Sequence, residues 1–178
     1  MRPKRSRRVF ILISLAVAVV GAAAAVTALA AVSGSAGPIT AVNVVSDNGL
    51  QETSSRTFVD IPGAATSIRV PSRQRGLIVA RFSAASQCGS LNPDDDGCFV
   101  RILVGGVEAE PANAGPFDMA ACCPNSSNGD AFESHQIERS RGPLPPGSYP
   151  VTVQWQADAE NQFMIWGWHL TVERARVG

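Results

Sequence analysis

The chain has 178 residues, with fifteen Lys and Arg against fifteen Asp and Glu. Five basic residues lie within the first eight positions and every acidic residue lies at or after Asp47, so residues 31–178 carry ten basic and fifteen acidic side chains, a net charge of −5. This balance disfavours a nucleic-acid binder or a polybasic membrane-surface binder, because both need clustered positive charge. The 45% content of hydrophobic residues, with 16 Gly and 12 Pro, disfavours disorder and long helices.

Residues 1–30 are typical of an export segment. A basic stretch, 2–8, precedes the uncharged run 9–32, and Ala28 and Ala30 fit the A-x-A pattern of a cleavage site. Cleavage there would make Ala31 the mature N-terminus. The alternative is an uncleaved anchor helix, because the run is long enough to cross a hydrocarbon core of about 30 Å. Both alternatives place the rest of the chain outside the cytoplasm.

The basic stretch also contains a more specific pattern. Ser6-Arg7-Arg8-Val9-Phe10-Ile11 resembles the twin-arginine pattern S-R-R-x-F-L, with Ile in place of Leu. If Arg7 and Arg8 form such a signal, the domain folds before it crosses the membrane. The other interpretation is an ordinary basic head that contains two adjacent arginines, so the export route stays open.

Downstream of this segment, short apolar runs alternate with Gly, Pro, Asn and Asp. Residues 31–55 are expected to hold a flexible tether and a first strand, and residues 56–178 the folded domain. No stretch shows the period of an amphipathic helix, so we predict an all-β fold, an antiparallel β-sandwich of jelly-roll type. The candidate strands are Ile39–Val45, Thr57–Ile61, Thr66–Val70, Gly76–Ala84, Cys98–Val104, Val107–Glu110, Ala131–Ser140, Ser148–Ala157 and Gln162–Glu173.

Alternation within the last two runs predicts which residues are buried. Trp155 shares a face with valines of its strand, and Trp166 and Trp168 share the apolar face of the final strand. We therefore expect all three tryptophans to pack in the core rather than form a sugar-stacking platform. Gly105-Gly106 predicts a two-residue hairpin turn, because both central positions of a primed turn need positive φ.

Several of these segments carry a resemblance to known proteins. They are Phe58-Val-Asp-Ile-Pro62, Ile68-Arg-Val-Pro71, Gly76-Leu-Ile-Val-Ala-Arg-Phe-Ser83 and Gly147-Ser-Tyr-Pro-Val-Thr-Val-Gln-Trp155. Over about residues 56–174 the chain resembles small exported bacterial β-sandwich proteins. Its strand order is loosely similar to the jelly rolls of complement-type globular heads and tumour-necrosis-factor-like domains. The resemblance implies a fold and trimerisation, and it implies no activity.

The four cysteines predict disulfide chemistry, because an even number in an exported chain favours bridges. Cys88 and Cys98 bracket a loop between two predicted strands, so we predict a bridge between them. A bond between the neighbours Cys122 and Cys123 would form a strained ring, and crosswise pairing with Cys88 and Cys98 stays open. A zinc site is disfavoured, because there is no C-x-x-C spacing and the chain has only two histidines.

The loop between Cys88 and Cys98 also suggests a calcium site. Asn92, Asp94 and Asp96, followed by Gly97, match the first half of a calcium loop. An EF-hand is excluded, because its twelfth position would be Leu103 and a strand begins where its second helix should be. The choice is between a looser Ca²⁺ site on these three residues and a solvated acidic loop, and the loop is favoured.

Catalytic signatures are weak. No nucleophile-elbow, zincin, Walker or dinucleotide-binding motif is present. His135 follows Ser134, but neighbours on a strand point to opposite faces, so the two cannot pair directly. We expect His135 to be a surface histidine.

These observations lead to a functional expectation. We expect an exported, non-enzymatic β-sandwich module that binds an unidentified protein or glycan at the cell envelope or outside the cell. We expect no nucleic-acid partner, and we expect membrane contact only through the N-terminal segment. Self-association is expected because the resemblance implies it. The alternatives are a calcium-supported carbohydrate-binding module and a small secreted hydrolase that uses carboxylates such as Asp158 or Glu160. An exposed tryptophan in a groove would favour sugar binding, and a histidine beside a convergent carboxylate would favour an enzyme.

Overall fold

A computed structural model of the chain describes residues 36–89, 97–112, 117–119, 132–158 and 162–178. The chain divides into two units, 1–31 and 32–178, and the second is described here. Its described residues form the strands β1 (Ala36–Thr53), β2 (Val59–Val70), β3 (Arg75–Gly89), β4 (Cys98–Val104), β5 (Val107–Glu108), β6 (Phe117–Asp118), β7 (Glu133–Leu144), β8 (Gly147–Ala157) and β9 (Gln162–Val177). Within these residues no helix is long and apolar enough to cross a bilayer.

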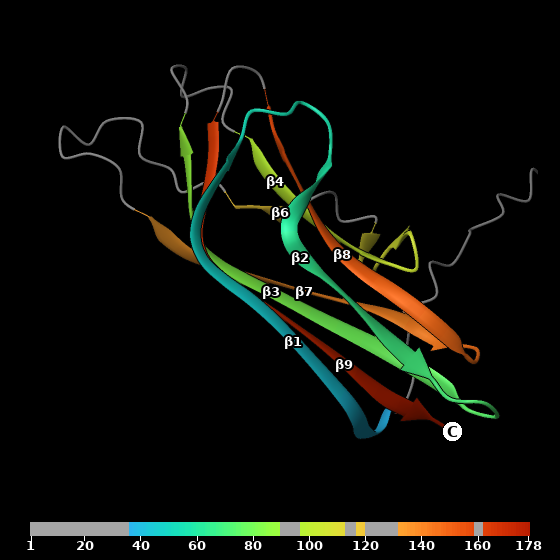
Figure 1. The fold of residues 1–178 in the computed structure, drawn as a ribbon. Coiled ribbons are helices and arrows are strands. Elements are labelled where there is room, and N and C mark those ends of the chain that lie inside the picture. Colours follow the sequence, from blue (N-terminus) through green and yellow to red (C-terminus); the bar gives the residue numbers. More distant parts are fainter. Residues whose placement is uncertain (1–35, 90–96, 113–116, 120–131, 159–161) are drawn as a thin grey trace, which may run out of the picture. The chain divides into compact units, whose positions relative to one another are not determined.

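The strands form two antiparallel sheets that pack face to face (Figure 1). One sheet has the order β1-β9-β3-β7, and the other has the order β2-β8-β4-β5 with β6 also paired to β4. Every strand pair is antiparallel. The prediction of an all-β antiparallel sandwich is therefore confirmed. The N-terminal helix that it included, with Arg7, Arg8, Ala28 and Ala30, lies outside the described residues.

The core lies between the sheets and is built from alternate residues of each strand. On β8 the predicted set Val151, Val153 and Trp155 is buried, as strand alternation requires. Trp155 contacts Phe163 of the opposite sheet, with ring centroids 5.6 Å apart. Burial of side chains of this size stabilises a fold by about 1.5–3 kcal/mol each, so this layer is the main source of stability.

A disulfide connects the two sheets. Cys88 near the end of β3 is bonded to Cys98 at the start of β4, which confirms the predicted pair. Cys98 is fully buried and belongs to the core. The other predicted cysteines and the candidate calcium ligands lie outside the described residues; they are Cys122, Cys123, Asn92, Asp94 and Asp96.

Glycines with positive φ mark the irregular points of the sheets. Gly105 and Gly106 have φ values of 61° and 76°, which confirms the predicted turn between β4 and β5. Gly63 has φ 79° and lies within β2, where the register with β8 shifts between Asp60 and Ala65. The predicted strands Thr57–Ile61 and Thr66–Val70 thus belong to one bent strand, β2, because the bulge at Gly63 allows β2 to pair with β8 on both sides of it.

A glycine bulge also changes the prediction for β9. Gly167 has φ 61°, and the register shifts beside it in the pairings with both β1 and β3. Trp166 and Gly167 therefore both face solvent, between the buried residues Ile165 and Trp168. The expectation that all three tryptophans are buried is correct for Trp155 and Trp168, each 2% exposed, and wrong for Trp166, which is 55% exposed.

Candidate functional site

The bulge creates a hollow on the outer face of the β1-β9-β3-β7 sheet. The hollow has a volume of about 490 Å³, within the range of small-molecule sites. Residues from all four strands line it: Asn48, Ser83, Ala84, Ala85, Ser134, His135, Trp166 and Gly167. Bulges often re-aim a side chain beside a functional site, and here the bulge presents an indole to solvent.

The indole of Trp166 is held in place although it is exposed. Its Nε1 donates a hydrogen bond to the carbonyl oxygen of Asn48 at 2.8 Å. The ring of Phe132 packs edge-on against it, with centroids 6.4 Å apart and an interplanar angle of 66°. A fixed aromatic ring loses little conformational entropy when a ligand packs against it, so Trp166 is preorganised for stacking.

The carbonyl that holds Trp166 comes from a second bulge, on β1. Between Asp47 and Leu50 the edge strand has two residues, Asn48 and Gly49, opposite the single Gly167 of β9. Asp47 supports this bend, because its carboxylate accepts hydrogen bonds from the backbone N–H of Gly49 at 2.7 Å and from the Gln51 amide at 3.1 Å. Asp47 is thus a positioning residue for the hollow.

His135 forms a different pair from the one considered in the sequence. Its Nδ1 lies 2.8 Å from Oγ of Ser86, and that hydroxyl donates to the carbonyl oxygen of Met119 at 2.9 Å. Because the single hydroxyl hydrogen goes to Met119, Ser86 accepts its second bond from Nδ1–H of His135. Ser86 is fully buried, so this pair connects β3, β7 and the segment after β6 beneath the hollow. The ring of His135 is half-buried, not a surface group as expected.

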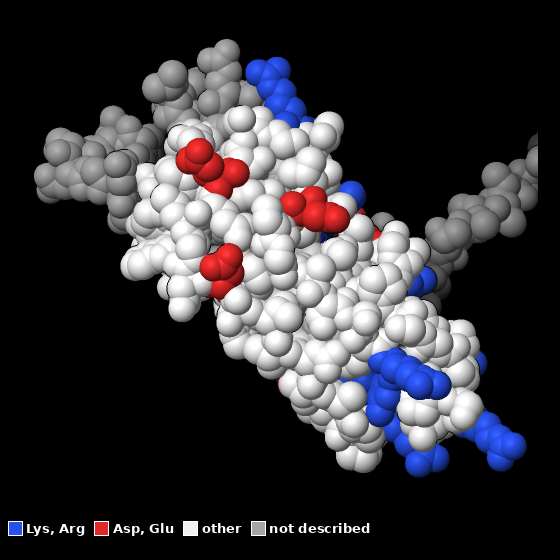
Figure 2. All heavy atoms as spheres, viewed as in Figure 1, with Lys and Arg blue, Asp and Glu red and all other residues white. Residues whose placement is uncertain are grey.

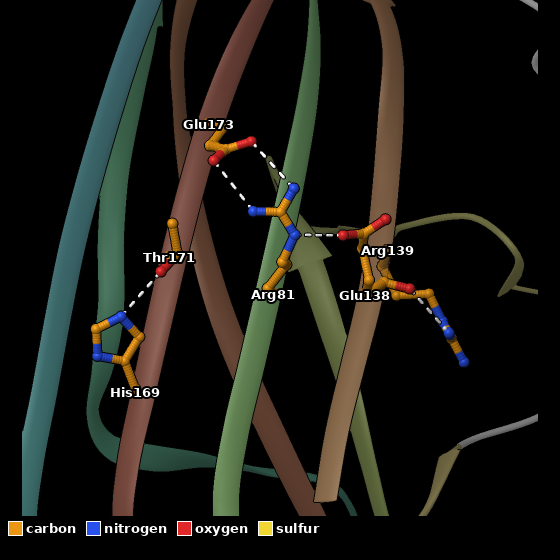
Figure 3. A network of polar contacts seen from close by, with 6 residues as sticks. All are labelled: Arg81, Glu138, Arg139, His169, Thr171 and Glu173. Carbon is orange, nitrogen blue, oxygen red and sulfur yellow. Dashed lines mark hydrogen bonds and ion pairs between the residues drawn. The ribbon is translucent and has the colours of Figure 1, made fainter. Parts of the chain in front are cut away.

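Further along the same face, an arginine on the central strand bridges its neighbours (Figure 3). Both terminal nitrogens of Arg81 contact the carboxylate of Glu173 on β9, at 3.1 and 3.2 Å, and Nε contacts Glu138 on β7. Glu173, and after it Glu138, raises the pKa of Arg81 above its ordinary value. Figure 3 shows that this group spans three strands, with His169 bonded to Thr171 beside it. Two carboxylates pair with the one guanidinium of Arg81, so this group supports the sheet and does not offer a free cation.

Of the two carboxylates considered for hydrolysis, Asp158 does not line the hollow. Asp158 lies after β8, where its carboxylate accepts a hydrogen bond from Gln156 at 3.1 Å, and Glu160 lies outside the described residues. Among the described residues there is no group of three His, Cys, Asp or Glu side chains that could hold a metal ion. Sequence analysis missed the hollow, although Gly167 between two tryptophans was a signal for a bulge.

Comparisons with known proteins assign no family to this chain. No family model matches the chain, and no curated protein matches it. Among solved structures, dimeric latent PorU from Porphyromonas gingivalis is similar over 82% of this chain, with 13% sequence identity and a TM-score of 0.39. This chain spans only 14% of the length of that chain.

Proposed function

We propose that the protein is an exported, non-enzymatic binding module and that its ligand is a carbohydrate that stacks on Trp166. The exposed, fixed indole in the hollow is the observation that carries this proposal. The C–H face of a sugar ring packs on an aromatic ring, and its hydroxyl groups require hydrogen-bonding partners. Ser83, Ser134 and His135 supply such groups around the indole.

The strand pairing supports a finer description of the fold. In a jelly roll a long antiparallel hairpin is wrapped around a sandwich, so the first strand pairs with the last, the second with the next to last, and so on inwards. When the two-residue strand β6, which also pairs with β4, is left out of the count, the pairs β1–β9, β2–β8, β3–β7 and β4–β5 follow that scheme. We propose a jelly roll on this basis, and self-association stays a prediction.

Export is supported by two features. A buried disulfide persists in oxidising compartments and is rare in the cytosol. The basic head and uncharged run of residues 2–32 have the order of an export signal or anchor. The calcium-supported form of the binding module stays a prediction, because its ligands lie outside the described residues.

The proposal is tested by titrating the purified exported chain with cellohexaose, chitohexaose and maltohexaose in a calorimeter. We expect at least one of them to bind and the variant Trp166→Ala to weaken that binding tenfold or more, since loss of one stacked ring removes about 1.4 kcal/mol or more. Leu50→Ala is the control, because Leu50 is opposite Trp166 in the register and is similarly exposed at 58%.

Two results would contradict the proposal. One is that none of the three oligosaccharides binds, and the other is that the best of them binds wild type and Trp166→Ala equally. Cleavage of an oligosaccharide by the wild-type chain, detected by chromatography, would instead favour the hydrolase.

A further inference from the structure

The fold concentrates positive charge at one end of the domain. Of the ten arginines in residues 31–178, five lie where β2 ends, β3 begins and β9 ends. We call this set the arginine-rich end: Arg69, Arg73, Arg75, Arg174 and Arg176. Figure 2 shows blue side chains gathered at the end where Figure 1 places the C-terminus, with red side chains only away from it.

No Asp or Glu forms an ion pair with these five arginines within the described residues. The segments that carry them or lie beside them, 36–46, 67–77, 102–107, 141–150 and 174–178, contain no Asp or Glu. The guanidinium groups at this end that form hydrogen bonds donate them to neutral acceptors. Arg75 donates to the carbonyl oxygen of Pro143 at 3.1 Å, and Arg174 donates to Oγ1 of Thr40 at 2.9 Å and to the carbonyl oxygen of Arg69. The positive charge is thus held in place and left uncompensated.

The turn at this end places an arginine where the backbone favours glycine. Arg73 has φ 61°, and the turn is closed by a hydrogen bond from Gln74 N–H to the carbonyl oxygen of Pro71 at 3.3 Å. A left-handed conformation is unfavourable for a residue with a Cβ, so Gly or Asn would fit this turn better. The side chain of Arg73 is exposed and points away from the core, so its presence has no packing reason.

The same end is where the chain enters the domain. Ala36, the first residue of β1, pairs with Val177, the last residue of β9. Three residues separate Ala36 from Val32, the end of the apolar run, and the four residue steps from Val32 to Ala36 reach at most about 14 Å. If residues 9–32 stay in the membrane as an anchor, the arginine-rich end contains the described residue that is nearest to that anchor along the chain.

We propose that the arginine-rich end binds the anionic headgroup surface of a lipid bilayer, so that the domain stands on the membrane with the Trp166 hollow directed away from it. Charge complementarity gives the attraction, since each arginine near an anionic surface strengthens binding about fivefold. The short chain distance to the uncharged run selects a bilayer over other polyanions. This proposal departs from the expectation of membrane contact through the N-terminal segment alone, because net charge does not show how the fold distributes that charge.

The test uses the full chain with vesicles of phosphatidylcholine alone or mixed equally with phosphatidylglycerol, and measures hydrogen–deuterium exchange by mass spectrometry. Comparing exchange at residues 70–77 and 174–178 keeps the result independent of whether the N-terminal segment inserts. We expect slower exchange in both segments with the anionic vesicles only. The variant Arg69→Gln/Arg73→Gly/Arg176→Gln should lose that protection, while Arg69→Lys/Arg73→Lys/Arg176→Lys should keep it.

The side chains of Arg69, Arg73 and Arg176 form no hydrogen bond or ion pair within the described residues, so the Gln/Gly variant should fold, and its thermal unfolding serves as the check. Arg73→Gly should leave the melting temperature unchanged or higher, because it removes an unfavourable backbone conformation. Equal exchange with both kinds of vesicle would overturn the proposal, as would protection that survives in the folded Gln/Gly variant. Stronger protection by a 20-nucleotide single-stranded DNA at equal phosphate concentration would also overturn it.

Discussion

At Gly167 the backbone has φ 61°, and a Cβ built there meets no atom within 4 Å. Glycine is therefore required at this position by the backbone conformation and not by a lack of space for a side chain. The left-handed region lets β9 carry one extra residue, and that residue moves the indole of Trp166 from the core face to the solvent face. Ser86 is the single residue that fixes the structure below the hollow. Its buried hydroxyl forms hydrogen bonds with Met119 and His135, whose polar atoms have no water to bond there.

We expect Gly167→Ala to lower the free energy of unfolding by about 1 kcal/mol, because alanine is disfavoured at this φ although its methyl group fits. Gly167→Asn is the matched variant and should be less destabilising, since Asn adopts the left-handed region more readily. Urea unfolding followed by fluorescence measures both. Equal stability of wild type and Gly167→Ala would show that the backbone at the bulge is not constrained.

At the scale of elements, the disulfide joins β3 to β4 and so connects the two sheets at one end. We expect the double variant Cys88→Ala/Cys98→Ala to lose about 3 kcal/mol of stability, because the bridge closes a short loop and restricts the unfolded chain. Alanine avoids placing a hydroxyl at Cys98, which is fully buried. Denaturation with and without dithiothreitol checks this. The reductant should destabilise wild type and leave the double variant unchanged, and a loss below about 0.5 kcal/mol would contradict the prediction.

Local features of the sequence were enough for most of the elements. The Gly105-Gly106 turn and the alternation of β8 were predictable because each depends on a few adjacent residues. The position of Trp166 was not, because a bulge at Gly167 appears only in the register with the neighbouring strands, and the Asn48 carbonyl that holds the indole is more than a hundred residues away in the chain. The Ser86–His135 contact was missed for the same reason, since the two residues are 49 positions apart.

At the scale of the whole molecule, the sandwich separates two chemically different regions. Trp166 and Val177 are both on β9, and the eleven residue steps from one to the other extend roughly 35 Å. The described lining of the hollow has hydroxyl, amide, imidazole and indole groups and no carboxylate or arginine. The arginine-rich end carries five guanidinium groups. The net charge of −5 over residues 31–178 did not predict this separation, because it does not show that the strand pairing brings half of the arginines together at one end.

The two regions should respond differently to ionic strength. Raising NaCl from 0.1 to 1 M shortens the Debye length from about 10 Å to about 3 Å, which screens attraction between exposed arginines and lipid phosphates. We expect the vesicle-dependent protection of residues 70–77 to disappear at 1 M NaCl, while the dissociation constant of the best oligosaccharide changes less than twofold, because stacking and neutral hydrogen bonds are not screened. Hydrogen exchange and calorimetry on the same preparation measure both. Protection that persists at 1 M NaCl would mean that the arginine-rich end contacts lipid through apolar groups. A tenfold fall in the affinity for the oligosaccharide would mean that a charged group outside the described lining takes part in sugar binding.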